Sequence, residues 1–567
     1  MNRSLICLLV VLHNVVAIAQ PANVKIFYNG TIYTGRSSSI TVAAVAISND
    51  KILAAGSLQD VQKAAGSAAE RVDLKGAFMM PGLIDSHSHV ISGGRSLLVA
   101  NLGDTLLSID ALGEYAKRSI ANGRGLRGDV LYIQGLHSAT WNEIQSLSIL
   151  FNGPAFTGRS VFLRGSDGHT AWANAALLER AHIDASFIKT LSESELAFFG
   201  ITNGVADGRL SEDAIAYITK VIPTSSISPL DALMAGVRHL NALGITAWMD
   251  PATGSTSDGI SNTSLEAYEQ AFQKGMLTAR VTSIIVAEGN AEPQPQIKVV
   301  KEWQQRLTST GIKVAGFKIF SDGVMEYPTQ TASMINAYKN SGKHGSQMVD
   351  PLKFQKFLVA ADRENLLVHI HAIGDKAVTE SLDAVAAARK ANNNSRLPHS
   401  ITHLQCVQPS DFGRFKTLNV LASMQLLWAT ADNYTEELVK PYIDATAYHY
   451  MYPAHSIMAN GGTICGASDW PVSSANPFQA MSVAEARGGT DGILNASEIM
   501  NRVDMLQSYT LHAARAILRD HEIGSIEAGK QADLIVVDRD VLRVSSDAIR
   551  DTKVLWTMVN GNIVYKR

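Results

Sequence analysis

Four stretches of the chain place metal-binding residue types directly after apolar runs. In the first, residues 83–90 read Leu-Ile-Asp-Ser-His-Ser-His-Val, so His87 and His89 stand two positions apart. Because successive side chains of a strand point to opposite faces, these two imidazoles would lie on the same face. Two imidazoles on one face of a strand end can bind a single metal ion. The alternative is that both are simply polar residues where a buried strand ends.

Three later apolar runs end in the same way. The potential ligands that they supply are His369 and His371 in one run, His403 in the next and Asp469 in the last. A single histidine at a strand end is more often a hydrogen-bonded structural residue than a ligand. Taken together, the series predicts a metal site that is assembled strand by strand.

Lys318 stands inside the apolar run Phe317-Lys318-Ile319-Phe320, where a charged amine is costly to bury. One interpretation is an ion pair with Asp322 or another buried carboxylate. The other is an amine of lowered pKa that adds carbon dioxide. The resulting carbamate is a carboxylate analogue, and it could bridge two metal ions.

Apolar runs alternate with helical stretches between residues 81 and 519, a pattern typical of repeated βα units. Strands are expected at 161–163, 247–250, 281–286, 314–320, 366–371, 400–403, 420–425 and 463–468. Helices are expected at 229–243, 264–274, 297–308, 351–364, 376–391 and 503–518. The predicted fold class is therefore α/β, with a TIM-like (β/α)8 barrel whose carboxyl-terminal strand ends carry the chemistry.

Both ends of the mature chain, residues 20–80 and 520–567, are rich in short strand patterns. In the second of them, Asn560-Gly561 is typical of a hairpin turn. The segment from about 125 to 228 fits no simple βα repeat. The stretch of sequence between His89 and Lys318 is also longer than the few βα units between them need. We therefore expect a subdomain inserted over the mouth of the barrel.

The N-terminus has the pattern of a secretory signal. Arg3 precedes a mostly apolar stretch, and Ala17-Ile18-Ala19 fits the small-x-small cleavage rule. The stretch is too short and too interrupted by polar residues to be a good membrane span. We expect residues 1–19 to be a signal peptide cleaved near Ala19, and the mature protein to be secreted or periplasmic without stable membrane insertion. A buried N-terminal helix is the alternative.

The composition is that of an ordinary enzyme: 567 residues, 46% hydrophobic, with a net charge of -3. A charge so close to neutral implies neither a nucleic acid nor an anionic membrane as a partner. Cys406 and Cys465, which remain after signal cleavage, are too few for a disulfide framework, although one bridge stays open. A homodimer is also left open.

From about Val24 to the C-terminus, the chain resembles the metal-dependent amidohydrolases, and within them the branch similar to YtcJ and N-substituted formamide deformylase. The similar stretches are 81–89 for the first-strand motif, 317–323 for the lysine strand, 371–375 for the fifth-strand motif, 468–472 for the eighth-strand motif, 167–174 for a stretch peculiar to the branch, and 524–534 for the tail. The chain departs from the branch at Thr402-His403, where Glu-His is usual.

The resemblance implies a β-sandwich built from both chain ends and a ligand set. His87 and His89 would hold the more buried ion, shared with Asp469, and His371 and His403 would hold the second. A carboxylated Lys318 would bridge them. The metal would be zinc, as one or two ions, with two favoured. His369 lies outside the branch motif, so we expect it to be a supporting or core residue.

The same resemblance assigns the chemistry. Asp469 would take a proton from the attacking water and pass it to the leaving nitrogen. His169 could donate a hydrogen bond to the developing oxyanion, with Trp172 nearby, or the two could be a helix cap and a core residue. Asp85, Asp322 and Asp375 are expected to support the ligands rather than to react.

The expected protein is a secreted metal-dependent hydrolase that cleaves non-peptide amide C–N bonds of a small molecule, such as an N-substituted formamide or N-acyl amine. A lactone, cyclic-amide or phosphoester hydrolase on the same barrel is the alternative, since fold alone does not separate these activities. A non-catalytic binding protein that has lost its metals is a minor alternative, because all six expected ligand positions hold suitable residue types.

Overall fold

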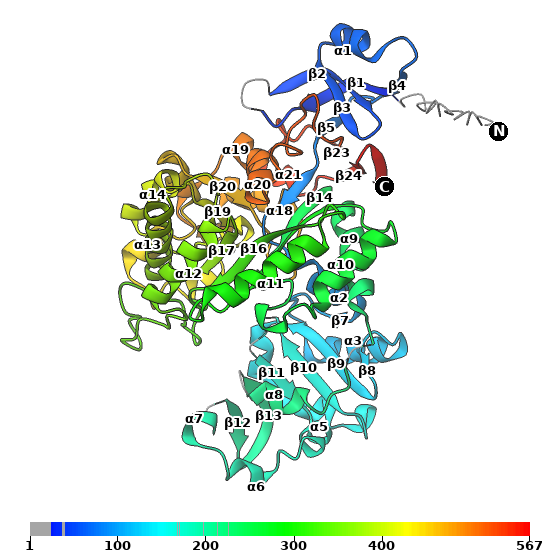
Figure 1. The fold of residues 1–567 in the computed structure, drawn as a ribbon. Helices are drawn as coiled ribbons and strands as arrows, with labels where there is room; N and C mark the ends of the chain where they lie inside the picture. Colours follow the sequence, from blue (N-terminus) through cyan, green and yellow to red (C-terminus); the bar gives the residue numbers. More distant parts are fainter. Residues whose placement is uncertain are drawn as a thin grey trace, which may run out of the picture.

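The structure is a computed structural model, which describes residues 24–36, 40–166, 168, 170–196, 198–211, 214–224 and 226–567. The expected signal peptide and His169 lie outside these residues. Figure 1 shows three units in a row: a sheet that carries both ends of the chain, a central barrel, and the inserted unit at the far end.

The two ends of the chain share one sheet, with the order β25-β24-β23-β5-β1-β2-β3 and β4 paired to β1. The strands are β1 (Val24–Tyr33), β2 (Thr41–Ser48), β3 (Lys51–Gly56), β4 (Glu70–Asp73), β5 (Phe78–Pro81), β23 (Leu534–Val537), β24 (Val554–Val559) and β25 (Asn562–Lys566). β5 joins the two ends, because it pairs with β1 on one side and with β23 on the other. The expected hairpin turn is present, since Asn560 and Gly561 both have positive φ angles, 51° and 72°.

Eight parallel strands form the barrel, in the order β20-β19-β18-β17-β16-β15-β14-β6. They are β6 (Leu83–Asp85), β14 (Ile245–Asp250), β15 (Arg280–Val286), β16 (Lys313–Phe320), β17 (Leu367–Ala372), β18 (Ser400–His403), β19 (Leu421–Met424) and β20 (Thr463–Gly466). The first and last strands meet where the backbone N–H of Ser86 donates to the carbonyl oxygen of Gly466, at 3.0 Å. The predicted α/β barrel is therefore confirmed.

Helices surround this barrel, and several begin with a proline in the first turn, where its missing N–H costs nothing. They include α2 (Val90–Leu98), α9 (Pro229–Ala242), α10 (Thr263–Gln273), α11 (Pro293–Arg306), α12 (Pro351–Arg363), α13 (Asp375–Asn392), α14 (Phe412–Thr417) and α18 (Pro477–Ala486). The expectation of one helix over 503–518 is wrong, because α19 (Arg502–Ser508) and α20 (Leu511–Ala516) are separate. Between them the carbonyl oxygen of Tyr509 accepts from the N–H of Ile84 at 2.8 Å, which turns the backbone toward the first barrel strand.

The inserted unit has its own sheet, in the order β12-β13-β11-β10-β9-β7 with β8 paired to β9. Its strands are β7 (Ala100–Asn101), β8 (Leu126–Arg127), β9 (Val130–Leu136), β10 (Val161–Gly165), β11 (Thr170–Ala173), β12 (Phe199–Thr202) and β13 (Val205–Ser211). The strand expected at 161–163 therefore belongs to the insertion and not to the barrel, and the sheet begins before residue 125. The hydroxyl of Tyr434 reaches back from the barrel to Asp104, at 3.2 Å.

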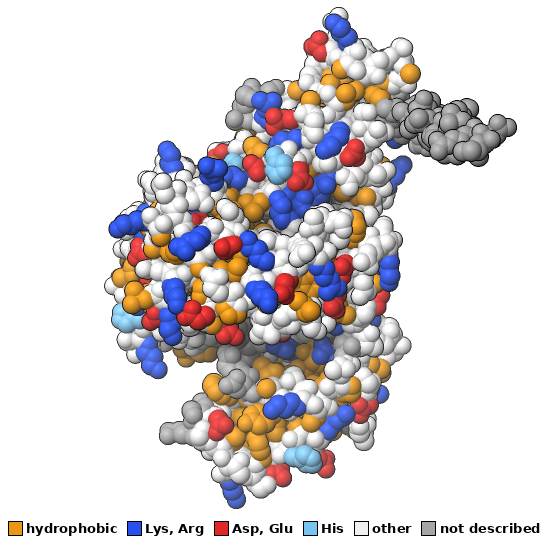
Figure 2. Space-filling view, viewed as in Figure 1, with side chains coloured by type: hydrophobic (Ala, Val, Ile, Leu, Met, Phe, Trp, Pro, Cys, Tyr) orange, Lys and Arg blue, Asp and Glu red, His pale blue; other side chains and the backbone are white. Residues whose placement is uncertain are grey.

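Cys406 and Cys465 are both buried and free, so they form no disulfide with each other. Within the described ranges, no helix is both long and apolar enough to cross a membrane. Figure 2 shows acidic and basic side chains mixed over the visible face of the barrel, in keeping with the small net charge.

We predict that Gly94→Ala lowers the melting temperature. A β-carbon at Gly94, in α2, would lie 1.8 Å from the carbonyl oxygen of Ala232 in α9, so the two helices would have to move apart. Overpacking of this kind costs about 1–3 kcal/mol or more. Gly413→Ala in α14 is the matched control, because a β-carbon there meets nothing within 4 Å. Equal melting temperatures of the two variants, measured by scanning fluorimetry, would contradict this account of the helix contact.

Candidate metal centre

The structure brings the six expected ligand residues to one end of the barrel. His87 and His89 follow β6, and Asp469 follows β20. The Oδ1 atom of Asp469 lies 3.2 Å from Nε2 of His87 and 3.1 Å from Nε2 of His89. Both Nε2 atoms face the same carboxylate oxygen, but the two histidines lie beyond the end of β6 and not within a strand, so the alternation of strand side chains does not account for this.

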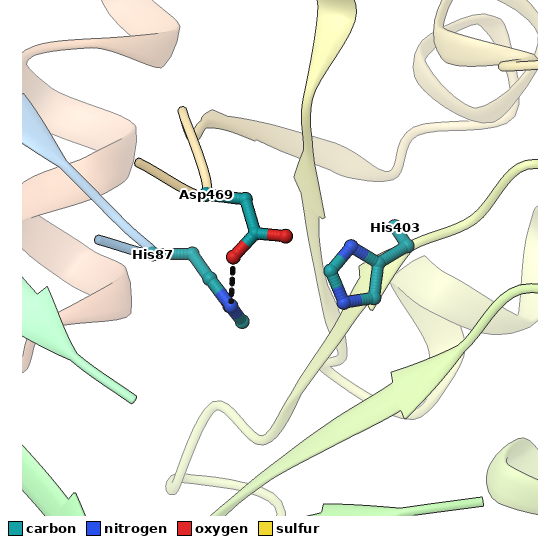
Figure 3. Close-up of side chains that lie close together, drawn as sticks. All are labelled: His87, His403 and Asp469. Atoms are coloured by element: carbon teal, nitrogen blue, oxygen red, sulfur yellow. Dashed lines mark ion pairs between the residues drawn. The ribbon is translucent and has the colours of Figure 1, made fainter. Parts of the chain in front are cut away.

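His403, at the end of β18, faces this group from the opposite side (Figure 3). Its ring centre lies 5.2 Å from that of His87 and 4.4 Å from that of His371 in β17. One ligand atom each from His87, His403 and Asp469 all lie within 4.8 Å of one another. The side chains of both expected half-sites thus form one continuous cluster.

The ring of His87 is fixed by a second histidine. Its Nδ1 atom lies 2.7 Å from Nε2 of His369, and Nδ1 of His369 lies 2.7 Å from Oγ of Ser400. If Nε2 of His87 is to offer its lone pair to a cation, its proton must sit on Nδ1 and be donated to His369. His369 then donates its own proton to Ser400. His369 is therefore placed as the expected supporting residue, fully buried behind His87.

Oxygen atoms orient His371 and His403. Nε2 of His371 lies 3.0 Å from the carbonyl oxygen of Gly323, and Nδ1 of His403 lies 3.1 Å from Oε1 of Gln425. A carbonyl oxygen only accepts, so each of these nitrogens carries the proton. The remaining nitrogen of each ring keeps its lone pair. At Thr402, where the branch usually has glutamate, the hydroxyl oxygen accepts from the Gln425 side chain at 3.2 Å.

Burial keeps these imidazoles neutral. Burial, with the nearby charge of Lys318, lowers the pKa of His371 to about 4, and burial also holds the pKa values of His87 and His403 well below the ordinary range. Burial raises the pKa of Asp469, but the His89 hydrogen bond and nearby positive groups outweigh it, so its pKa is lowered. At neutral pH His87, His371 and His403 offer neutral nitrogen donors, and Asp469 offers an ionised carboxylate.

Lys318 points into the same cluster from β16, in register with His369 of the neighbouring strand. It is 1% exposed, and burial lowers its pKa to about 7 against the opposing charge of Asp469. The alternative of an ion pair with Asp322 is not formed, since that carboxylate accepts instead from the backbone N–H groups of Ser333, Ile373 and Gly374. A large fraction of the amine is therefore unprotonated near neutral pH.

These residues fit a divalent metal ion. Neutral imidazoles and carboxylate oxygens are the donors that zinc prefers, and the donor atoms converge in a buried place. His87, His89 and Asp469 can hold one ion, and His371 and His403 a neighbouring one.

The three supporting carboxylates expected from the sequence accept hydrogen bonds from backbone N–H groups, and Oδ1 of Asp322 also lies 3.6 Å from Nε2 of His371. Asp85 accepts from the N–H of His87 and from both the N–H and hydroxyl of Ser468. Asp375 accepts from the N–H of Ile335, at 2.8 Å. Burial raises the pKa of Asp85 and of Asp322 to about 7.

Two aromatic side chains flank the cluster. Phe320 is 39% exposed and its ring lies 5.5 Å from that of His371, while Trp428 lies parallel to His403 at 5.8 Å. Trp172, by contrast, is buried in the core of the insertion, where its indole N–H donates to the carbonyl oxygen of Asp207. Of the two readings of Trp172, the geometry fits the core residue.

Sequence reasoning missed Gln425, Phe320 and Trp428. Gln425 is the last residue of the strand expected at 420–425 and directly follows β19. A polar side chain at the end of an apolar strand is the same signal that singled out the histidines. Phe320 and Trp428 carry no such signal, because an aromatic residue in or after an apolar run is ordinarily core.

Comparison with known proteins identifies the family of the chain. The amidohydrolase family model matches residues 70–565. The chain is 25% identical to the putative amidohydrolase YtcJ of Bacillus subtilis, over 96% of this chain and 99% of that protein. It is 24% identical to the N-substituted formamide deformylase of Arthrobacter pascens, over 95% of this chain and 98% of the enzyme.

The solved structures agree on the fold. An uncharacterized metal-dependent hydrolase from Pyrococcus horikoshii superposes with a TM-score of 0.71 at 24% identity, covering 92% of this chain and 99% of the other. Together with the barrel and its buried donor cluster, these matches show that the chain belongs to the amidohydrolase family and is a metal-dependent hydrolase.

Proposed function

We propose that this hydrolase is a secreted zinc enzyme that cleaves amide C–N bonds outside ordinary peptides, in substrates such as N-substituted formamides or N-acyl amines. The observation that carries the proposal is the meeting of His87, His89 and Asp469 with His371 and His403. The likeness to a formamide deformylase over nearly the whole chain supports the choice of bond.

When bound, the metal would supply Lewis acidity toward the substrate carbonyl and a water that ionises near neutral pH. The chain's own part is to place a proton acceptor and to exclude bulk solvent. Asp469 is ionised and buried, so its carboxylate can take the proton of the attacking water and return it to the departing nitrogen.

Lys318 would bridge two ions as a carbamate. Its unprotonated Nζ attacks the carbon of carbon dioxide, the new N–C bond forms, and one proton leaves to solvent. The buried amine of lowered pKa supports this step, because only the neutral form is nucleophilic.

The substrate class is tested by a panel of N-substituted formamides, N-acyl amines, lactones, cyclic amides and phosphoesters, assayed with the zinc-loaded enzyme. We expect the linear amides to be hydrolysed with the highest kcat/KM. Preferential hydrolysis of lactones, cyclic amides or phosphoesters would contradict the proposed bond specificity, and inactivity toward every class would favour a binding protein.

We predict that Lys318→Ala abolishes hydrolysis and lowers the zinc content per chain, because the bridging carboxylate is lost. Lys313→Ala in the same strand is the control, since that amine instead contacts the carbonyl oxygen of Leu518. Elemental analysis and the amide assay read both effects. Full activity with unchanged zinc in Lys318→Ala would remove the bridging role.

We also predict that His369→Leu weakens zinc binding by about 10- to 100-fold, the usual effect of removing the partner that orients a ligand. His369→Gln keeps an oxygen that can accept from Nδ1 of His87, so it should recover part of this loss. Zinc affinity is measured by competition with a chelator, alongside the melting temperature of the metal-free proteins. Equal zinc affinity in both variants and the unmutated chain would show that His369 only fills space.

A further inference from the structure

A cavity lies where the insertion meets the barrel, and none of its lining residues belongs to the metal centre. It has a volume of about 360 Å³ and is lined by Arg95, Arg127, Thr219, Ile222, Pro223 and Thr224. Arg95 belongs to α2, the barrel helix that begins directly after His89, whereas the other five belong to the inserted segment. The cavity is large enough for a small molecule.

Among the described residues, no carboxylate pairs with the guanidinium groups at this cavity. Nε of Arg127 is buried and has no hydrogen-bond partner, and its guanidinium carbon lies 3.4 Å from the centre of the Tyr132 ring. Arg95 donates one hydrogen bond, to the carbonyl oxygen of Ile227 at 3.0 Å. Neither arginine forms an ion pair with any carboxylate in the described part of the chain.

Repulsion between like charges further destabilises these arginines. Burial lowers the pKa of Arg127, Tyr132 partly offsets it, and the positive charges of Arg95 and Arg164 lower it further. Three guanidinium groups therefore act on one another in a partly buried place. A buried donor without a partner destabilises the folded protein, and repulsion between like charges adds to that cost. A bound anion would stabilise this arrangement, because it would supply both the missing hydrogen-bond acceptor and the opposite charge.

We propose that this cavity is a binding site for a small oxyanion, a carboxylate or a phosphate. The planar guanidinium presents paired N–H groups that match the oxygen atoms of either one. The threonine hydroxyls on the wall offer polar contacts, while Ile222 and Pro223 offer an apolar surface for the rest of the ligand. Because Arg95 belongs to the barrel and Arg127 to the insertion, the anion would join the two units.

The site is tested on the full-length zinc-loaded protein by isothermal titration calorimetry, in separate titrations with inorganic phosphate and acetate at constant ionic strength. We expect saturable binding of at least one, weakened about tenfold or more in Arg127→Met and in Arg95→Met. Arg124→Met is the matched control, because Arg124 is an exposed arginine that does not line the cavity. It should bind as the unmutated chain does.

All three variants keep the metal cluster, so any binding of phosphate to zinc would persist in each of them. Only binding at the arginines would be weakened in Arg95→Met and Arg127→Met. The two arginine variants also serve as independent tests should one fail to fold. The anion that binds more tightly identifies the ligand class. Equal affinity in all four proteins, or no saturable binding of either anion, would overturn the proposal.

Discussion

The carboxylate of Asp85 is the constraint on which the rest of the site depends. It is fully buried, and it accepts from the backbone of His87 at 3.1 Å and from the N–H and hydroxyl of Ser468 at 3.0 and 2.5 Å. His87 follows the first barrel strand and Ser468 the last, so one side chain fixes the distance between the histidine pair and Asp469. Burial raises the pKa of Asp85 to about 7, and these three hydrogen bonds oppose that effect.

The other half of the cluster is braced in the same way. Asp322 holds the backbone after β17 through Ile373 and Gly374, and so fixes the segment that follows His371. His403 and Asp469 themselves have positive φ angles, 77° and 54°, a backbone conformation that residues other than glycine rarely adopt. Such strain persists only where the surroundings hold it, and here it turns both side chains toward one place. The barrel supplies the positions, and buried polar groups supply the orientation.

Much of the barrel and of the ligand cluster could be predicted from the sequence, because the residues that mark them stand out from the apolar runs around them. A histidine or aspartate that ends an apolar run marks a barrel strand end, and proline at the start of α9 and α12 marks the helices. The break at Tyr509 was not predictable from helical periodicity, since its cause is a hydrogen bond to Ile84, more than 400 residues away. The resemblance led us to expect a supporting or core role for His369, but its hydrogen-bond partners His87 and Ser400 became apparent only once β17 lay beside β18. The strand at 161–163 looked like a barrel strand because local pattern does not tell which sheet a strand joins.

The most direct test of the account is the metal content of the unmutated protein, measured by elemental analysis together with amide hydrolysis before and after chelation. We expect one or two zinc ions per chain, loss of hydrolysis when they are removed, and recovery when zinc is returned. Full-rate hydrolysis by protein that holds no stoichiometric metal would contradict the central claim.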